Sequence, residues 1–377
     1  MKTRFILFFI LILALGLRLP HLLDKEYGTD EEASIYDAKL IKDSSPFTYF
    51  FSSIPYELSP PVFFHILALA LIAYDSVITL KILMVVFGML GIIVFYLLAK
   101  NLFNERFALF ATFLYAVNPM HIIYSQHIRS YIFIFLLYTL SLYFMHKFLF
   151  KKDSQSLIYL GITYVLAAYT HYWTMLFMAV GFVTVLLFYY LDKDTKIKQY
   201  IIFGIIIFIL AIPALLLLQE QFSIHNALGI TNLWPTLTPK IVPYPFWKYS
   251  VMTDVSTTLD NFPYLFAMFP ILIGISIYGA YLLYKRKKKE CIFIVSSLSA
   301  PFIIYTSIGF VWPVYSFRYI TYLLIPYVLL YSYGLFNVKN KALRIALIIT
   351  LLAGWTYIIY YYYDISQFYL WSEHIAV

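Results

Sequence analysis

The sequence predicts an all-α protein that crosses a membrane many times, and three observations support this prediction. Of its 377 residues, 62% are hydrophobic and only 12% are charged, whereas about a quarter of the residues of a soluble domain are charged. The mean hydropathy is +0.80. The apolar residues also gather in runs, several of them close to the roughly twenty residues that a helix needs to cross the hydrocarbon of a bilayer. A soluble fold is therefore excluded.

Twelve apolar runs are candidate helices. The first, in MKTRFILFFILILALGL, has the charged start and apolar middle of a signal peptide, but no small-residue cleavage site follows it, so we expect a retained span. The twelve runs cover approximately residues 4–22, 61–74, 77–99, 106–118, 130–150, 157–169, 172–191, 200–218, 263–284, 291–311, 319–336 and 345–363.

The sides of the membrane follow from the Lys and Arg residues in the short loops, because positively charged loops stay in the cytoplasm. Basic residues cluster at 151–152, 193–198 and 285–289, and at the N-terminus. Four crossings cannot fit between residue 30 on the outside and residue 151 in the cytoplasm. All four clusters can therefore be cytoplasmic only if one apolar run between these residues does not cross the membrane. The run 61–74 is short and opens with two prolines, which favours an interfacial segment. We therefore predict about 11 spans, with a cytoplasmic N-terminus and a juxtamembrane helix in the first outer loop.

This topology divides the chain into three parts. Residues 1–218 form a transmembrane module that includes the outer loop 23–76, residues 219–262 form a second outer loop, and residues 263–377 form the C-terminal transmembrane helices. Most acidic residues fall on the outer side. Because Asp and Glu contribute little to orientation, this distribution suggests a functional outer face.

The charge and cysteine content exclude other classes. The net charge of +8 comes from short basic clusters between apolar runs, which indicates topology signals rather than a nucleic-acid surface. The single Cys291 excludes a disulfide framework and a thiolate metal cluster.

The densest polar cluster is GTDEEAS, which places Asp30, Glu31 and Glu32 just beyond the first span. One interpretation is a solvated helix start, with Asp30 as N-cap and the glutamates near the positive end of the helix dipole. The alternative is a functional acidic site, since three adjacent carboxylates repel one another and have no structural advantage at a membrane surface.

Three further segments lie at the same predicted face. YSQHIRSY (124–131) contains Arg129, THYW (170–173) contains His171, and WPVYSFRY (312–319) contains Arg318. Each alone is more often an interfacial anchor, but all of them converge on one side. A carboxylate can accept a proton from a hydroxyl nucleophile, and arginines can bind a phosphate and stabilise its developing charge. Together these groups suggest transfer of a sugar from a lipid-linked phosphosugar.

At these residues the sequence resembles the GT-C class of integral-membrane glycosyltransferases, the group that includes protein O-mannosyltransferases and aminoarabinose transferases. GTDEEAS resembles the acidic motif of their first outer loop, SPPVFFHIL (59–67) their Pro-Pro segment, and YSQHIRSY their Ser-x-x-x-Arg-x-Tyr segment. THYW is similar to their Thr-His-Tyr segment, and FRYITYLLIP (317–326) to their later Arg-Tyr…Pro element. The resemblance is clearest over residues 1–190.

The resemblance implies an inverting transfer from a polyprenyl monophosphate sugar to an acceptor hydroxyl. It implies that Asp30 is the base, that Glu31 positions the acceptor or holds the base, and that Arg129 pairs with the carboxylates or the donor. It further implies that Arg318 contacts the lipid phosphate and that His171 is a supporting or phosphate-side donor. The acidic pair of the family motif could instead align with Glu31 and Glu32, which makes Glu32 a candidate for substrate binding.

The implied partners are the lipid-linked sugar donor, membrane lipid, and an acceptor that is a protein, a lipid or a glycan. The implied location is the plasma membrane, with the site on its outer face. The acidic cluster could bind a divalent cation through oxygen ligands, but no other carboxylate motif requires one. We therefore expect no metal site and no certain cofactor.

Two other classes of protein compete with this interpretation. A transporter or flippase of a lipid-linked sugar predicts charged residues near the bilayer midplane and broken helices in inverted halves, but the predicted spans carry almost no charge apart from Lys81 near an outer end. A membrane scaffold explains the aromatic loops but gives no reason for the clustered carboxylates and arginines.

Overall fold

The computed structural model describes residues 2–22, 28–44, 59–193, 196–227, 239, 242–252, 263–312 and 316–364. Within these ranges every regular element is a helix. The prediction of an all-α polytopic protein is therefore confirmed.

Eight helical segments of the described part are long and apolar enough to cross a membrane, by length and composition. They are α4 (Val77–Leu102), α7 (Tyr131–Lys151), η1 (Tyr172–Met175) with α9 (Leu176–Leu191), α10 (Ile197–Ala227), η4 (Pro263–Ala267) with α13 (Met268–Arg286), α14 (Lys288–Val311), η5 (Phe317–Leu323) with α15 (Leu324–Phe336), and α16 (Lys341–Tyr363). The other three expected spans coincide with shorter helices, α1 (Lys2–Gly16), α5 (Glu105–Ala116) and α8 (Ser156–Ala168). That all eleven cross the bilayer stays a prediction.

The chain turns sharply after α5, where the sequence predicted only the end of a span. Asn118 ends that segment, and its side chain accepts hydrogen bonds from the N–H groups of Met120 (3.0 Å) and His121 (3.4 Å). With Pro119 in the first position, this N-cap begins a short helix, α6 (Pro119–Tyr124). The helix α6 leads into residues 125–130, which we call the Arg129 loop.

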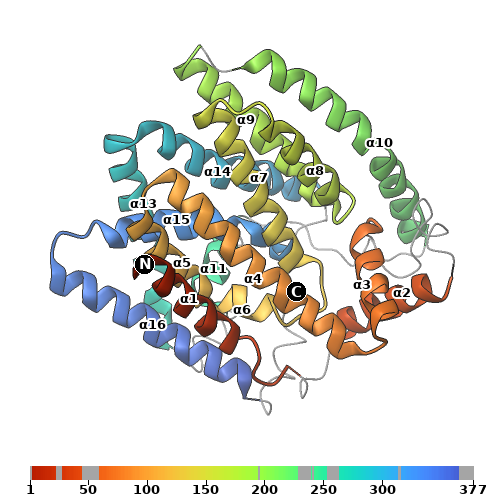
Figure 1. Cartoon of the computed structure of the whole chain (residues 1–377), viewed down its shortest axis with the longest axis horizontal. Coiled ribbons are helices and arrows are strands. Elements are labelled where there is room, and N and C mark those ends of the chain that lie inside the picture. The colour runs from red at the N-terminus through yellow and green to blue at the C-terminus, as the bar shows by residue number, and fades with distance from the viewer. Residues whose placement is uncertain are drawn as a thin grey trace.

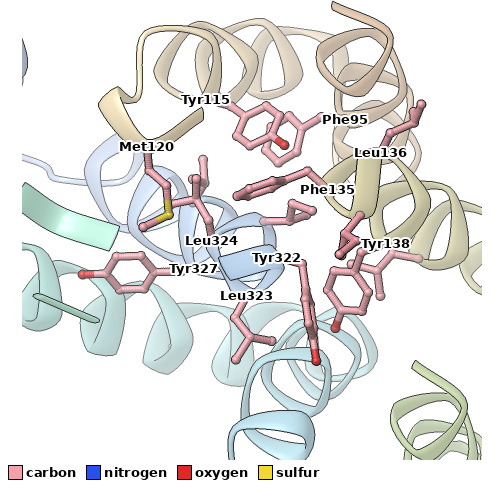
Figure 2. Close-up of a cluster of buried hydrophobic side chains, with 14 of the residues drawn as sticks. Phe95, Tyr115, Met120, Phe135, Leu136, Tyr138, Tyr322, Leu323, Leu324 and Tyr327 are labelled. Atoms are coloured by element: carbon pink, nitrogen blue, oxygen red, sulfur yellow. The ribbon is translucent and has the colours of Figure 1, made fainter. Parts of the chain in front are cut away.

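The helices α7 and α15 form the centre of the bundle. Within the most apolar stretch of each segment, 78% of α7 and 89% of η5–α15 are buried inside the protein. The corresponding share is 22% for α10, which lies at the edge. Figure 2 shows Phe135 and Tyr138 of α7 among Tyr322, Leu323 and Leu324, and the rings of Tyr138 and Tyr322 lie 4.6 Å apart. In lipid, such close packing rather than exclusion of water stabilises helix association. Because η5 belongs to this core, the residues that it carries have a rigid support.

Two helices lie together at one end of α4, namely α2 (Thr29–Asp43) and α3 (Val62–Ala73) (Figure 1). The helix α3 is about 18 Å long, well short of the roughly 30 Å of hydrocarbon. Its residues Phe63, Phe64 and Leu67 are buried, and Lys42 pairs with Asp75 at 2.5 Å where α3 leads into α4. This arrangement agrees with a juxtamembrane helix and does not by itself assign a side of the membrane.

The three basic loops that fixed the predicted orientation meet at the opposite end of the bundle. Asp192 pairs with Lys289 at 2.9 Å and with Lys152 at 3.7 Å, and the Lys196 ammonium donates to the Lys152 carbonyl at 3.0 Å. The 21 residues of α7 separate this end from the Arg129 loop by about 30 Å. The basic loops and the candidate site residues therefore lie at opposite ends of the bundle.

The second outer loop differs in part from the expectation. The helix α10 continues to Ala227, so residues 219–227 extend that helix rather than begin a loop, and Tyr244–Val251 form α11. The remainder of 219–262, apart from residues 239, 242, 243 and 252, lies outside the described residues, as do residues 45–58. The division into 1–218, 219–262 and 263–377 stays an expectation.

A cysteine at Asp75 tests the predicted sidedness. In a Cys291→Ala background, we expect Asp75→Cys to react with a membrane-impermeant maleimide in right-side-out vesicles, because α3 does not cross. The matched control is Lys151→Cys at the basic end, which should react only after permeabilisation. If position 75 reacts only after permeabilisation, α3 crosses the membrane and the parity argument is wrong.

Candidate active site

The acidic motif forms the first turn of α2. The N-cap is Gly28 rather than Asp30, so the expectation of an Asp30 N-cap is wrong. Gly28 has extended backbone, and its N–H donates to Glu31 Oε2 at 3.4 Å, which is one half of a capping box. With the helix starting at Thr29, the side chains of Asp30 and Glu31 point in different directions and have different surroundings.

Glu31 is buried and ties α2 to the Arg129 loop. Its side chain is 7% exposed, and Oε1 accepts a hydrogen bond from the Ile128 N–H at 2.8 Å. A buried carboxylate is costly unless it accepts hydrogen bonds, and the N–H groups of Gly28 and Ile128 supply them. Glu31 is thus a structural neighbour of Asp30 and faces away from solvent.

Asp30 meets Arg318, 288 positions away in the sequence. Nη1 of Arg318 donates to Oδ2 of Asp30 at 2.5 Å, with the two side chains 17% and 53% exposed, respectively. The other oxygen, Oδ1, makes no hydrogen bond within the described part of the chain. Arg318 Nε is buried and has no partner there either. The carboxylate and the guanidinium therefore both retain sites for a ligand.

Arg129 holds the same turn of α2 from the other side. Its Nη1 donates to the main-chain carbonyl of Asp30 at 2.8 Å and to the Ser34 hydroxyl at 2.9 Å. Ser34 is one helical turn after Asp30, so both acceptors lie on one face of α2. Arg129 therefore fixes the position of the Asp30 backbone, while Arg318 contacts its side chain.

The two arginines control the charge of Asp30. Partial burial alone raises the pKa of this carboxyl, but the positive charges of Arg129 and Arg318, together with the hydrogen bond from Arg318, outweigh that effect and hold the pKa below its usual value. Asp30 is therefore ionised throughout the neutral pH range.

His171 begins η1 beside these residues. Its Nδ1 accepts the Trp173 N–H at 3.3 Å, so the neutral ring carries its proton on Nε2. Burial, and then the charge of Arg129, lower the pKa of His171 to about 3. The ring lies 5.0 Å from that of Tyr319 and 6.3 Å from that of Tyr131, the neighbours of Arg318 and of the Arg129 loop. His171 is thus a neutral donor at the edge of the site.

The Pro-Pro segment packs on the His171 segment. The Val62 N–H donates to the Tyr169 carbonyl at 2.9 Å, and the Gln221 side chain links the Ser59 carbonyl (3.3 Å) to the Tyr172 hydroxyl (2.9 Å). The segments 59–67 and 170–173, which are far apart in the chain, therefore pack against each other.

The structure brings most of the sequence-predicted residues together. Asp30 is hydrogen-bonded directly to Arg129 and Arg318. Glu31 contacts the Arg129 loop through the Ile128 N–H, and His171 is adjacent through aromatic contacts. Glu32 is exposed and makes no polar contact in the described part of the chain. Of the two possible registers of the acidic motif, Asp30 and Glu31 form the pair that meets the arginine-bearing segments.

Comparison with known proteins shows which family and which fold this chain is similar to. Residues 59–217 match the model of the dolichyl-phosphate-mannose-protein mannosyltransferase family. The fold is similar to that of ArnT from Cupriavidus metallidurans in the apo state, with a TM-score of 0.65 and 12% identity over 92% of this chain and 61% of that one. No curated protein matches the sequence.

Two further structures contain a lipid phosphate. ArnT from the same organism bound to undecaprenyl phosphate matches with a TM-score of 0.62 and 13% identity, over 90% of this chain and 60% of that one. The archaeal oligosaccharyltransferase AglB from Archaeoglobus fulgidus, in complex with an inhibitory peptide and a dolichol-phosphate, matches with a TM-score of 0.61 and 14% identity, over 97% and 56%. The chain has the GT-C fold. It spans less than two thirds of the length of each of these GT-C proteins.

The sequence did not single out several residues of this GT-C site. Ser34 could have been found from its spacing of one turn from Asp30 on a helix. Tyr124 and Tyr319 were quoted within motifs but given no role. The hydroxyl of Tyr124 is buried and has no hydrogen-bond partner among the described residues. The positions of both tyrosines beside the arginines depend on contacts between distant segments, for which the sequence has no local signal.

The pKa of Asp30 gives a pH dependence. Because the depressed pKa belongs to the free protein, we expect kcat/KM of the transfer proposed below to be independent of Asp30 protonation between about pH 5 and 7, and to fall only as the pH drops through the lowered pKa. Arg129→Gln removes a charge that favours ionisation and should shift the acid limb upward. A pH–rate profile of both proteins is the measurement, and an acid limb that does not move would contradict the assigned electrostatics.

Proposed function

We propose that this protein is a glycosyltransferase that moves a sugar from a polyprenyl monophosphate to an acceptor hydroxyl on the outer face of the plasma membrane. The observation that carries the proposal is the Asp30 carboxylate, which lies half exposed against Arg318 at one end of a GT-C bundle. A base and a phosphate-binding cation side by side are the two groups that such a transfer needs.

The proposed chemistry is a single displacement. The acceptor oxygen attacks the anomeric carbon while the bond from that carbon to the phosphate oxygen breaks, and the bonding pair leaves with polyprenyl phosphate. Asp30 takes the proton of the acceptor hydroxyl through its unpartnered Oδ1. The configuration at the anomeric carbon is inverted, because attack comes from the face opposite the leaving group.

Arg318 is the proposed ligand of the lipid phosphate. A guanidinium binds phosphate through paired hydrogen bonds, and Nε of Arg318 is a donor with no other partner in the described residues. On binding, the phosphate competes with Asp30 for the arginine. This exchange weakens the hold of Arg318 on the carboxylate and makes Asp30 a stronger base once the donor is present.

His171 and Glu31 have supporting roles in this proposal. The Nε2–H of His171 can donate to the phosphate or to the sugar without adding a charge. Glu31 holds the turn that carries Asp30, through Gly28 and Ile128. Glu32 has no role in this arrangement.

The acceptor is a protein, a lipid or a glycan. The relatives include one structure solved with an inhibitory peptide and a dolichol-phosphate, which supports a lipid-linked donor here and leaves the acceptor class open to experiment. A flippase is the alternative function, and it moves the intact lipid-linked sugar without releasing polyprenyl phosphate.

Transfer tests both the function and the register of the acidic motif. The reconstituted protein given polyprenyl-phosphate sugars should release polyprenyl phosphate in the presence of an acceptor. We expect Asp30→Asn to lower kcat by about 10²- to 10⁴-fold, the usual contribution of a general base, and the matched control Glu32→Gln to retain near wild-type activity. Loss of activity in Glu32→Gln with retention in Asp30→Asn would move the register to Glu31 and Glu32.

We further propose that the transfer requires no divalent cation. Arg318 can supply the positive charge at the phosphate that a cation would otherwise supply. EDTA should therefore leave the rate of transfer unchanged. Inactivation by EDTA that Mg²⁺ or Mn²⁺ reverses would contradict this.

A further inference from the structure

A third arginine, Arg18, lies in the interior and has no role in the proposed chemistry. It follows α1, is fully buried at 0% exposed, and forms no ion pair within the described part of the chain. Burying an uncompensated guanidinium carries a large desolvation penalty. The groups around Arg18 must therefore offset that cost.

The compensation comes from two helix ends and two side chains. The guanidinium donates to the carbonyls of Ala14 (2.7 Å) and Ala116 (3.1 Å), in the last turns of α1 and α5, where the helix dipoles favour a cation. It also donates to Ser125 Oγ at 3.1 Å and contacts His121 Nδ1 at 2.6 Å. Because arginine only donates, His121 accepts through Nδ1 and is neutral.

The residue after Ser125 holds the backbone of the same segment. The amide of Gln126 donates to the carbonyls of Arg18 (2.8 Å) and Pro20 (3.1 Å). The hydroxyl of Tyr363, at the end of α16, donates to the Leu17 carbonyl and lies 3.4 Å from the Gln126 amide. The start of the Arg129 loop is thus fixed to the end of α1 by both side-chain and main-chain bonds.

The helix α4 is shaped to admit this arrangement. A Cβ at Gly88 would overlap the Ser125 side chain and approach the Arg18 guanidinium. The absence of a side chain at position 88 lets the Arg129 loop and Arg18 approach the backbone of α4 closely.

From this anchor, the loop reaches the candidate site within four residues. Ile128 donates to Glu31, and Arg129 donates to the Asp30 carbonyl. We propose that Arg18 is a positioning residue, which places Asp30 by holding the Arg129 loop. Arg318 belongs to η5, which the aromatic core supports independently of Arg18. This inference rests on the proposed function and deepens it, because it separates the positioning of the base from the binding of the donor phosphate.

Kinetics of Arg18→Gln test the inference. We expect kcat to fall at least about 10-fold, because small displacements of a reacting group are costly, while KM for the lipid-linked donor changes less than about twofold. Gln126→Leu, which removes the other half of the anchor, should give the same pattern, and the double variant should lose less than the product of the two single losses. Arg18→Lys retains the positive charge at the two helix ends but loses the planar guanidinium with its fixed set of donors. We therefore expect this variant to lose little thermal stability and to lose more of its kcat.

The matched control is Thr184→Val, which removes a buried hydrogen bond between Thr184 and Ser296 (2.8 Å) in another part of the bundle. It should lower thermal stability without changing kcat. If Arg18→Gln and Gln126→Leu behave like this control, with kcat of the folded protein unchanged, Arg18 is merely structural and the inference is overturned. Should Arg18→Gln fail to fold, Ser125→Ala and Gln126→Leu carry the same test.

Hydrogen exchange separates this inference from the proposed function. In lipid nanodiscs, we expect peptides that cover residues 125–131 to exchange faster in Arg18→Gln than in the wild type, whereas those of α9 do not. If residues 125–131 exchange faster in Arg18→Gln but the wild-type protein shows no sugar transfer, the positioning role of Arg18 is supported and the proposed glycosyltransferase activity is contradicted. Unchanged exchange in this loop would overturn the positioning role whatever the activity.

Discussion

The hydrocarbon of a bilayer offers the peptide backbone no hydrogen-bond partner, and this constraint governs the arrangement of the molecule. It admits only segments that satisfy their own N–H and C=O groups, so the apolar stretches are helices. Polar chemistry is displaced to the ends of the bundle, where water and lipid headgroups can share it. The site then has to be assembled from short connections, namely the first turn of α2, the Arg129 loop, the start of η1 and the start of η5.

Short connections cannot hold reacting groups rigidly by themselves, and the structure compensates with buried polar contacts. Glu31 and Arg129 clamp the first turn of α2 to the Arg129 loop, and Gln126 fixes that loop to the end of α1. Arg318 is held separately, by aromatic packing around η5. The carboxylate and the guanidinium that meet at the site are therefore supported by independent parts of the bundle.

Much of this architecture follows from the sequence, and the limits have physical causes. Apolar runs and basic loops predicted the helices and their order, and charge parity predicted that α3, which the structure shows to be short, does not cross the membrane. The sequence singled out Asp30, Arg129 and Arg318 as candidate site residues, because charged side chains clustered at one predicted face of the membrane suggest a functional site. The sequence did not predict the hydrogen bonds of Glu31 to Gly28 and Ile128, the short helix α6 or the Arg18 anchor. Each depends on a hydrogen bond between segments far apart in the chain, and hydropathy and helical periodicity carry no information on such pairings.

The depressed pKa of Asp30 at first conflicts with its proposed work, because a weak base accepts a proton poorly. The exposure of the pair resolves the conflict. Because the Asp30 side chain is 53% exposed, solvent screens its bond to Arg318, which is therefore weaker than a fully buried ion pair. A phosphate that binds the same guanidinium through paired charge-assisted hydrogen bonds gains more than this screened bond, so the donor can displace the carboxylate at little cost. The displaced Asp30 then lies beside a phosphate rather than an arginine, and the negative charge of that phosphate raises its basicity when the acceptor arrives. In the proposed mechanism, the ion pair of the free protein thus keeps Asp30 ionised and inactive until the lipid-linked donor is bound.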